Sequence, residues 1–151
     1  MMRLVIINVF FLMFILTSCR TTDNASSPDN FGKEPKTTAI RPVLVQNDFI
    51  AENALSDFVI TKAIIEESIL SITISYTGCK DDIIDLVFNG NYLKSYPMKA
   101  QLYVKRSAGS QGCDKKMVQD LKFDLSPVKP GSGNTLILML QNYNEKLTYQ
   151  Y

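Results

Sequence analysis

The chain has 151 residues, 46% of them hydrophobic, and carries sixteen Lys and Arg against fifteen Asp and Glu. This length suits one domain, and the balanced charge offers no basic surface for nucleic acid and no polybasic segment for anionic lipid. The chain contains no histidine, which excludes Ser-His-Asp and Cys-His nucleophiles, His metal sites and the usual proton shuttle at neutral pH. No Gly-rich loop has phosphate-binding or dinucleotide-binding spacing, so we predict no cofactor.

The first nineteen residues have the pattern of an export signal. Arg3 is followed by a run from Leu4 to Leu16 that is apolar except for one Asn. This run is too short to span a membrane comfortably and has the length of a signal-peptide core.

The sequence Leu16-Thr17-Ser18-Cys19 resembles the lipobox of bacterial prolipoproteins. The resemblance implies cleavage before Cys19, lipid on its sulfur and acylation of the new amino terminus, and several acyl chains anchor a protein stably. Arg20, where inner-membrane lipoproteins carry Asp, implies the outer membrane of a bacterial envelope without fixing the leaflet. The alternative is a plain signal peptide or anchor helix that happens to contain a cysteine.

Three regions are therefore predicted: a signal peptide over 1–18, a lipidated Cys19 with a tether over 19–39, and a folded domain over 40–151. The tether is rich in Ser, Thr, Asn, Asp, Pro and Lys. Such a composition buries too little apolar surface to fold.

From residue 40 onward the dominant hydrophobic period is two, as in the stretch "ILSITISYT", where apolar and hydroxyl side chains alternate. The predicted strands are 41–46, 58–65, 69–77, 83–88, 98–106, 121–125, 135–140 and 147–151. Turns are predicted at 66–68 and 89–91. The strand at 41–46 is predicted to lie at an edge, because Pro42 cannot donate a ladder hydrogen bond. A weak helix is predicted at 48–58.

Seven or eight short strands separated by turns indicate an all-β sandwich or barrel. We expect a single antiparallel, immunoglobulin-like β-sandwich with one disulfide.

Two cysteines remain once Cys19 is assigned to lipid. Cys79 and Cys113 form an even pair in an oxidising compartment, so a disulfide is expected. It would close a loop of about 34 residues and contribute roughly 3–4 kcal/mol. The alternatives are a redox pair or a metal site, although the spacing is not C-x-x-C and no His is available.

The stretch "SYTGC", the second loop cysteine and "KFDLSP" together resemble a loose group of small bacterial envelope lipoproteins without an assigned activity. The resemblance spans about residues 58–126. It implies a fold more than a function.

An acidic cluster follows Cys79. Asp81, Asp82 and Asp85 offer oxygen ligands for Ca²⁺ or a carboxylate pair for glycoside hydrolysis. The spacing is not that of a calcium loop, a solvated loop explains the same residues, and we predict no metal.

Tyrosines surround the predicted turn at 89–91. Tyr92, Tyr96 and Tyr103 are candidate contacts for a sugar or a protein partner. Tyrosine is also an ordinary strand residue.

The sequence thus favours a lipid-anchored, non-catalytic envelope protein that binds or braces a protein or glycan. Two alternatives remain. One is a small envelope hydrolase that uses Asp81, Asp82 or Asp85, and the other is a protease-inhibitor-like module that presents the 107–114 loop.

Overall fold

The computed structural model describes residues 38–151. The predicted signal peptide, Cys19 and the tether up to residue 37 lie outside this range. Within it, the fold is nearly all β, and no helix is long and apolar enough to cross a membrane.

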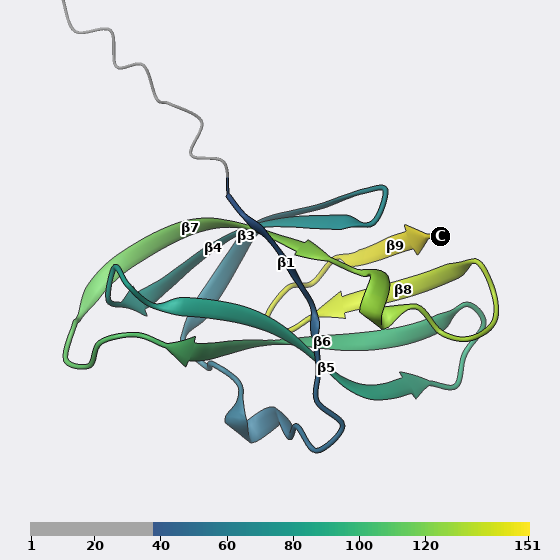
Figure 1. Cartoon of the computed structure of the whole chain (residues 1–151), viewed down its shortest axis with the longest axis horizontal. Helices are drawn as coiled ribbons and strands as arrows, with labels where there is room; N and C mark the ends of the chain where they lie inside the picture. The colour runs from purple at the N-terminus through teal and green to yellow at the C-terminus, as the bar shows by residue number, and fades with distance from the viewer. Residues whose placement is uncertain (1–37) are drawn as a thin grey trace, which may run out of the picture. The chain divides into compact units, whose positions relative to one another are not determined.

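The described strands form two sheets, one of four strands and one of five (Figure 1). Sheet A has the order β1-β7-β4-β3, with bounds Ile40–Pro42, Lys115–Asp124, Ile69–Gly78 and Phe58–Glu66. Sheet B has the order β2-β5-β6-β8-β9, with bounds Leu44–Val45, Ile83–Leu93, Met98–Ala108, Thr135–Leu140 and Lys146–Gln150.

The expectation of purely antiparallel sheets is wrong. β1 pairs with β7, β2 with β5 and β6 with β8 in parallel. The last pair is parallel because the chain leaves sheet B after β6, forms β7 in sheet A and then returns as β8 beside β6.

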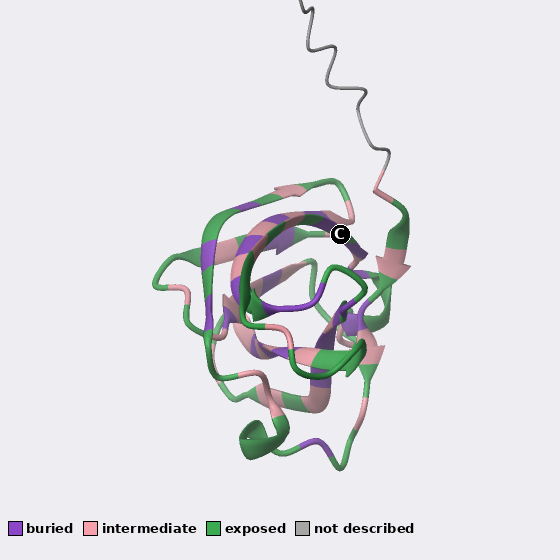
Figure 2. Ribbon diagram, turned by 90° about the vertical axis from the view of Figure 1, so that its left-hand side faces the viewer, coloured by how far each residue is buried: buried purple, intermediate pink, exposed green. Residues whose placement is uncertain are grey.

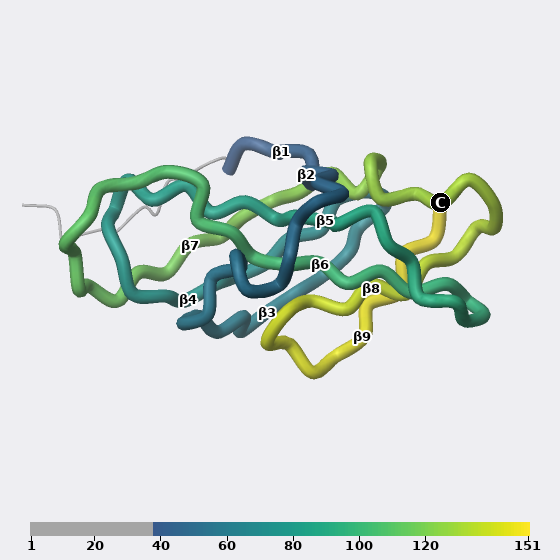
Figure 3. Tube along the Cα trace, turned by 90° about the horizontal axis from the view of Figure 1, so that it is seen from below, coloured from purple at the N-terminus to yellow at the C-terminus, as the bar shows by residue number. Residues whose placement is uncertain are grey.

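The N-terminal segment joins the two sheets. The single strand predicted at 41–46 is two short strands, and each lies at the edge of its sheet. The edge position of β1 agrees with the inability of Pro42 to donate a ladder hydrogen bond. Between them, Val43 is 2% exposed and belongs to the core. Beyond β2 the chain passes over β5 and β6 before it reaches β3 (Figure 3), and Phe49 packs there against Tyr103 with ring centroids 5.6 Å apart.

One core lies between the sheets, and burial alternates along the strands as predicted (Figure 2). On β4 the buried side chains are Leu70, Ile72, Ile74 and Tyr76, and on β6 they are Ala100, Leu102 and Val104, with Met98 partly buried. The hairpin predicted at 66–68 is confirmed, with the turn at Glu67 and Ser68 between β3 and β4.

Two local predictions fail. Residues 89–91 are not a turn: β5 runs on to Leu93, and the register shifts between Phe88 and Tyr92 because extra residues bulge out around Gly90. The chain reverses at 94–97 instead. The helix at 48–58 is reduced to a single 3-10 turn, η1, at Ala51–Asn53.

Candidate functional site: the disulfide end

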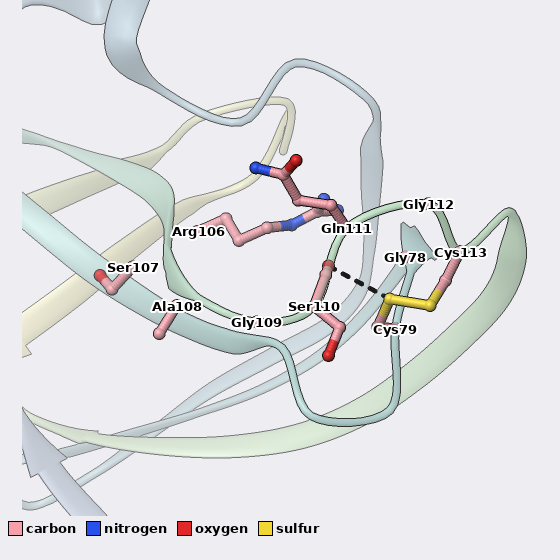
Figure 4. A pocket seen from close by; sticks show the side chains of 10 residues that line it. All are labelled: Gly78, Cys79, Arg106, Ser107, Ala108, Gly109, Ser110, Gln111, Gly112 and Cys113. Atoms are coloured by element: carbon pink, nitrogen blue, oxygen red, sulfur yellow. Dashed lines mark hydrogen bonds between the residues drawn. A yellow bond between two sulfur atoms is a disulfide. The ribbon is translucent and has the colours of Figure 1, made fainter.

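The Cys79–Cys113 disulfide predicted from the sequence lies at one end of the domain, with a Cα–Cα distance of 5.1 Å. It joins the turn after β4 to the loop between β6 and β7, which starts after Ala108. The Cys79 sulfur also lies 3.2 Å from the carbonyl oxygen of Ser110 (Figure 4). The loop predicted at 107–114 is therefore held at its middle and near its end, while residues 107–112 remain exposed.

Asp81 is engaged with this loop. It accepts a 2.6 Å hydrogen bond from the Ser110 hydroxyl. This hydrogen bond, together with backbone hydrogen bonds, lowers the pKa of the Asp81 carboxyl. The side chain thus braces the loop from outside.

Asp82 is the buried acidic residue of the described chain, at 5% exposure. Its Oδ2 accepts a 2.9 Å hydrogen bond from the Cys79 backbone N–H and lies 3.4 Å from Nε of Arg106. Its Oδ1 is buried without a hydrogen-bond partner. A buried carboxylate needs this kind of pairing, since an unpaired charge in the interior is very costly.

Two glycines make room for that carboxylate. A Cβ on Gly78 would lie 2.1 Å from Oδ2 of Asp82, and a Cβ on Gly109 would lie 1.9 Å from Oδ1. Gly109 also has a φ of +150°, a conformation that favours glycine. Gly78, at the end of β4, and Gly109, in the loop, are therefore each required by the position of the Asp82 carboxylate.

Asp85 belongs to a different contact. It lies on β5, and its Oδ1 is 2.6 Å from Nη1 of Arg41. The same guanidinium donates to the Ile84 carbonyl and so links β1 of sheet A to β5 of sheet B. The three acidic residues of the predicted cluster thus have three different partners, and no group of three His, Cys, Asp or Glu side chains in residues 38–151 could hold a metal ion.

Arg106 was not singled out in the sequence, and it is the central cation of the site. Besides Asp82, it donates a 2.7 Å hydrogen bond to the Thr77 carbonyl and lies 5.6 Å from the centre of the Tyr76 ring. A basic residue immediately before a Gly-rich loop is the sequence feature that would have pointed to it.

Tyr76 and Gln119 complete the polar network below Arg106. The Gln119 amide donates to the Tyr76 hydroxyl at 2.8 Å and to the Asp82 carbonyl at 3.4 Å. Burial, followed by the nearby Asp82 charge, raises the pKa of Tyr76 above its usual value of 10.0. The network ties β4, β7 and the turn after β4 together.

A cavity of about 320 Å³ opens at this end, a volume within the range of small-ligand sites. The loop curves past Arg106 from Ser107 to the disulfide (Figure 4). The residues lining the cavity are Gly78, Cys79, Arg106, Ser107, Ala108, Gly109, Ser110, Gln111, Gly112 and Cys113.

The three predicted tyrosine contacts do not form one surface. Tyr92 pairs with buried Ala100, faces the core side and donates a 3.1 Å hydrogen bond to the Val128 carbonyl. Tyr103 lies on the opposite face of the sheet, against Phe49. Tyr96 is fully exposed in the loop between β5 and β6.

Comparison with protein-family models finds no match, and comparison with curated proteins finds none either. Two solved structures are similar to this chain. A protein described as toxin-related from Parabacteroides distasonis is 14% identical, with a TM-score of 0.46, and the match covers 74% of this chain and 59% of that one. A protein of unknown function (DUF1344) from Bacteroides vulgatus is 15% identical, with a TM-score of 0.50 and coverage of 76% and 56%.

This chain therefore spans less than two thirds of either solved structure. At 15% identity, the likeness to the Bacteroides vulgatus protein is one of fold alone.

Proposed function

We propose that this protein is a lipid-anchored, non-catalytic binding protein of a bacterial envelope, and that the disulfide end contacts its protein or glycan partner. The observation that carries the proposal is the arrangement of the loop, the cavity and the carboxylates at the disulfide end. A loop fixed by a disulfide lines a cavity, while the neighbouring carboxylates of Asp81 and Asp82 are engaged in internal contacts. A rigid concave surface without an acid–base pair suits binding better than hydrolysis.

The anchor and the location rest on the lipobox-like sequence that ends at Cys19. We propose the outer membrane, because Arg20 follows the cysteine. Metabolic labelling with a clickable fatty acid should mark the wild-type protein, and Cys19→Ala should abolish the label. Persistent labelling of the variant would refute the anchor.

We also propose that the two sheets form an immunoglobulin-like sandwich. Nine described strands in two sheets around one core support this proposal. The parallel β6–β8 pair is a departure from the purely antiparallel pattern.

Partner binding at the disulfide end can be tested in cells with a photo-crosslinking residue. Replacing Gln111, which is exposed and lines the cavity, should yield a crosslinked product of defined mass. Replacing Gln150 is the matched control, because it is exposed on β9 and pairs with Thr135 at the far end of sheet B. Equal crosslinking at both positions, or at neither, would contradict the proposal.

A further inference from the structure

We propose that the cavity beside Arg106 binds its ligand through a carboxylate group. The inference rests on the proposed binding function and names the chemistry that the disulfide end would recognise. Four features carry it: the fixed guanidinium, the placement of charge, the glycine-rich wall and the geometry of a carboxylate.

The guanidinium of Arg106 is held in one orientation. Its Nη2 donates to the Thr77 carbonyl at 2.7 Å, its Nε lies 3.4 Å from Oδ2 of Asp82, and its Cζ lies 5.6 Å from the centre of the Tyr76 ring. Nη1 makes no hydrogen bond to any residue within 38–151. An arginine ordered before binding loses less side-chain entropy when a ligand arrives.

The charges at this site are arranged with the positive end outward. The Arg106 side chain is 36% exposed, whereas the Asp82 side chain is 0% exposed. Arg106 is the one charged residue in the cavity lining, and Asp81 contacts the loop through Ser110 without lining the cavity. An anion in the cavity therefore meets the guanidinium directly.

Small residues make up much of the remaining cavity wall. Gly78, Ala108, Gly109 and Gly112 line the cavity, and nothing lies within 4 Å of the place where a Gly112 Cβ would stand. Small side chains leave backbone N–H groups accessible, and successive N–H groups in such loops form concavities that bind anions. The disulfide and the Ser110–Asp81 hydrogen bond keep this wall in place.

A carboxylate suits this site better than a phosphate. Guanidinium and carboxylate are both planar and form charge-assisted hydrogen bonds of matching geometry. The positive charge of Arg106 is already partly offset by Asp82. A single negative charge matches what remains, whereas a phosphate group carries about −1.5 to −2 at pH 7.

The test is a titration of the full chain in detergent micelles, followed by NMR. The probes are N-acetyl-alanyl-alanine with a free carboxylate, the same dipeptide as its C-terminal amide, and inorganic phosphate, all at matched ionic strength. The free acid should shift the amide signals of residues 107–112 and the Nε–H signal of Arg106. The amide should bind at least about tenfold more weakly, because it lacks the charge that the guanidinium recognises.

Equal shifts from acid and amide, shifts from phosphate alone, or no shift at residues 106–112 would each overturn the carboxylate assignment. Crosslinking at Gln111 in cells has an independent readout. A positive crosslink with a negative titration would leave the binding function standing and remove only the carboxylate chemistry.

Variants sharpen the test. Gln111→Glu places a negative charge on the exposed rim and should weaken the free acid about tenfold or more, whereas Gln150→Glu makes the same change far from the cavity and should leave binding unchanged. Arg106→Gln alone would leave the buried Asp82 carboxylate without its positively charged partner. The double variant Arg106→Gln/Asp82→Asn removes both charges, and if it folds and still prefers acid over amide, the proposal is wrong.

Discussion

Gly109 has no space for a side chain, because Oδ1 of Asp82 and the Asp82 backbone occupy the position that a Cβ would take. We predict that Gly109→Ala destabilises the protein by about 2 kcal/mol or more, through the clash with a buried carboxylate and an unfavourable φ. Urea unfolding measures this. Gly131→Ala is the matched control, since nothing lies within 4 Å of its Cβ position, and an equal loss in both variants would contradict the steric explanation.

The Tyr76 hydroxyl should make the free energy of unfolding fall with rising pH in the alkaline range. The pKa of Tyr76 is raised in the folded protein, so the unfolded chain loses this proton first. The contribution of this group to the free energy of unfolding is fully present below about pH 10. It declines as the pH rises from the unfolded pKa towards the folded pKa. Tyr76→Phe should therefore show a shallower loss of unfolding free energy above pH 10.

The same variant loses the hydrogen bond from Gln119, which costs about 1 kcal/mol at neutral pH. Tyr92 and Tyr143 also have a raised pKa, so the Tyr76→Phe variant should still lose part of its unfolding free energy above pH 10. Tyr96→Phe, at a fully exposed position, should retain the wild-type slope. An unchanged slope in Tyr76→Phe would disprove the role of this hydroxyl.

Among the elements, the disulfide-bonded loop between β6 and β7 depends most on a covalent link. Replacing both cysteines with serine removes a bridge between residues that are 34 apart in sequence. We predict a loss of about 3–4 kcal/mol in unfolding free energy, measured by urea unfolding. The wild type unfolded under reducing conditions is the control and should lose a similar amount, whereas undiminished stability in the double variant would contradict the prediction.

The strands were predictable where one face is buried and the other is exposed to solvent. β4 and β6 follow that rule and were found almost to the residue. β7 is predicted only over 121–125, because Met117 is the one apolar side chain of residues 115–120 that packs against the core, and a single such residue does not produce an alternating pattern. The pairing of these residues with β4 comes from the tertiary structure. The bulge at Gly90 was mistaken for a turn because Asn-Gly is typical of both.

The site was only partly predictable for a related reason. The pairing of Cys79 with Cys113 was predictable from the even number of cysteines left after Cys19 and from the predicted oxidising compartment. The separation of Asp81, Asp82 and Asp85 onto three partners depends on Ser110, Arg106 and Arg41. Those partners lie between 24 and 44 positions away along the chain, a distance at which neither spacing nor periodicity indicates a contact.

At the scale of the whole molecule, the N-terminal segment couples the sheets. β1 pairs with sheet A, β2 pairs with sheet B, and Val43 between them is buried in the shared core. Arg41 adds a contact from β1 to Asp85 on β5. Because the segment contacts both sheets, it should hold them together as one folding unit.

Val43→Ala tests this coupling. The lost methyl groups and the resulting cavity should cost about 2 kcal/mol. Since both sheets share one core, hydrogen exchange should accelerate by the same factor in the central strands β4 and β6, about thirtyfold for 2 kcal/mol. Val45→Ala, at an exposed position on β2, should change neither the free energy of unfolding nor the exchange rates. Faster exchange in only one sheet would show that the sheets unfold separately and that the N-terminal segment does not couple them.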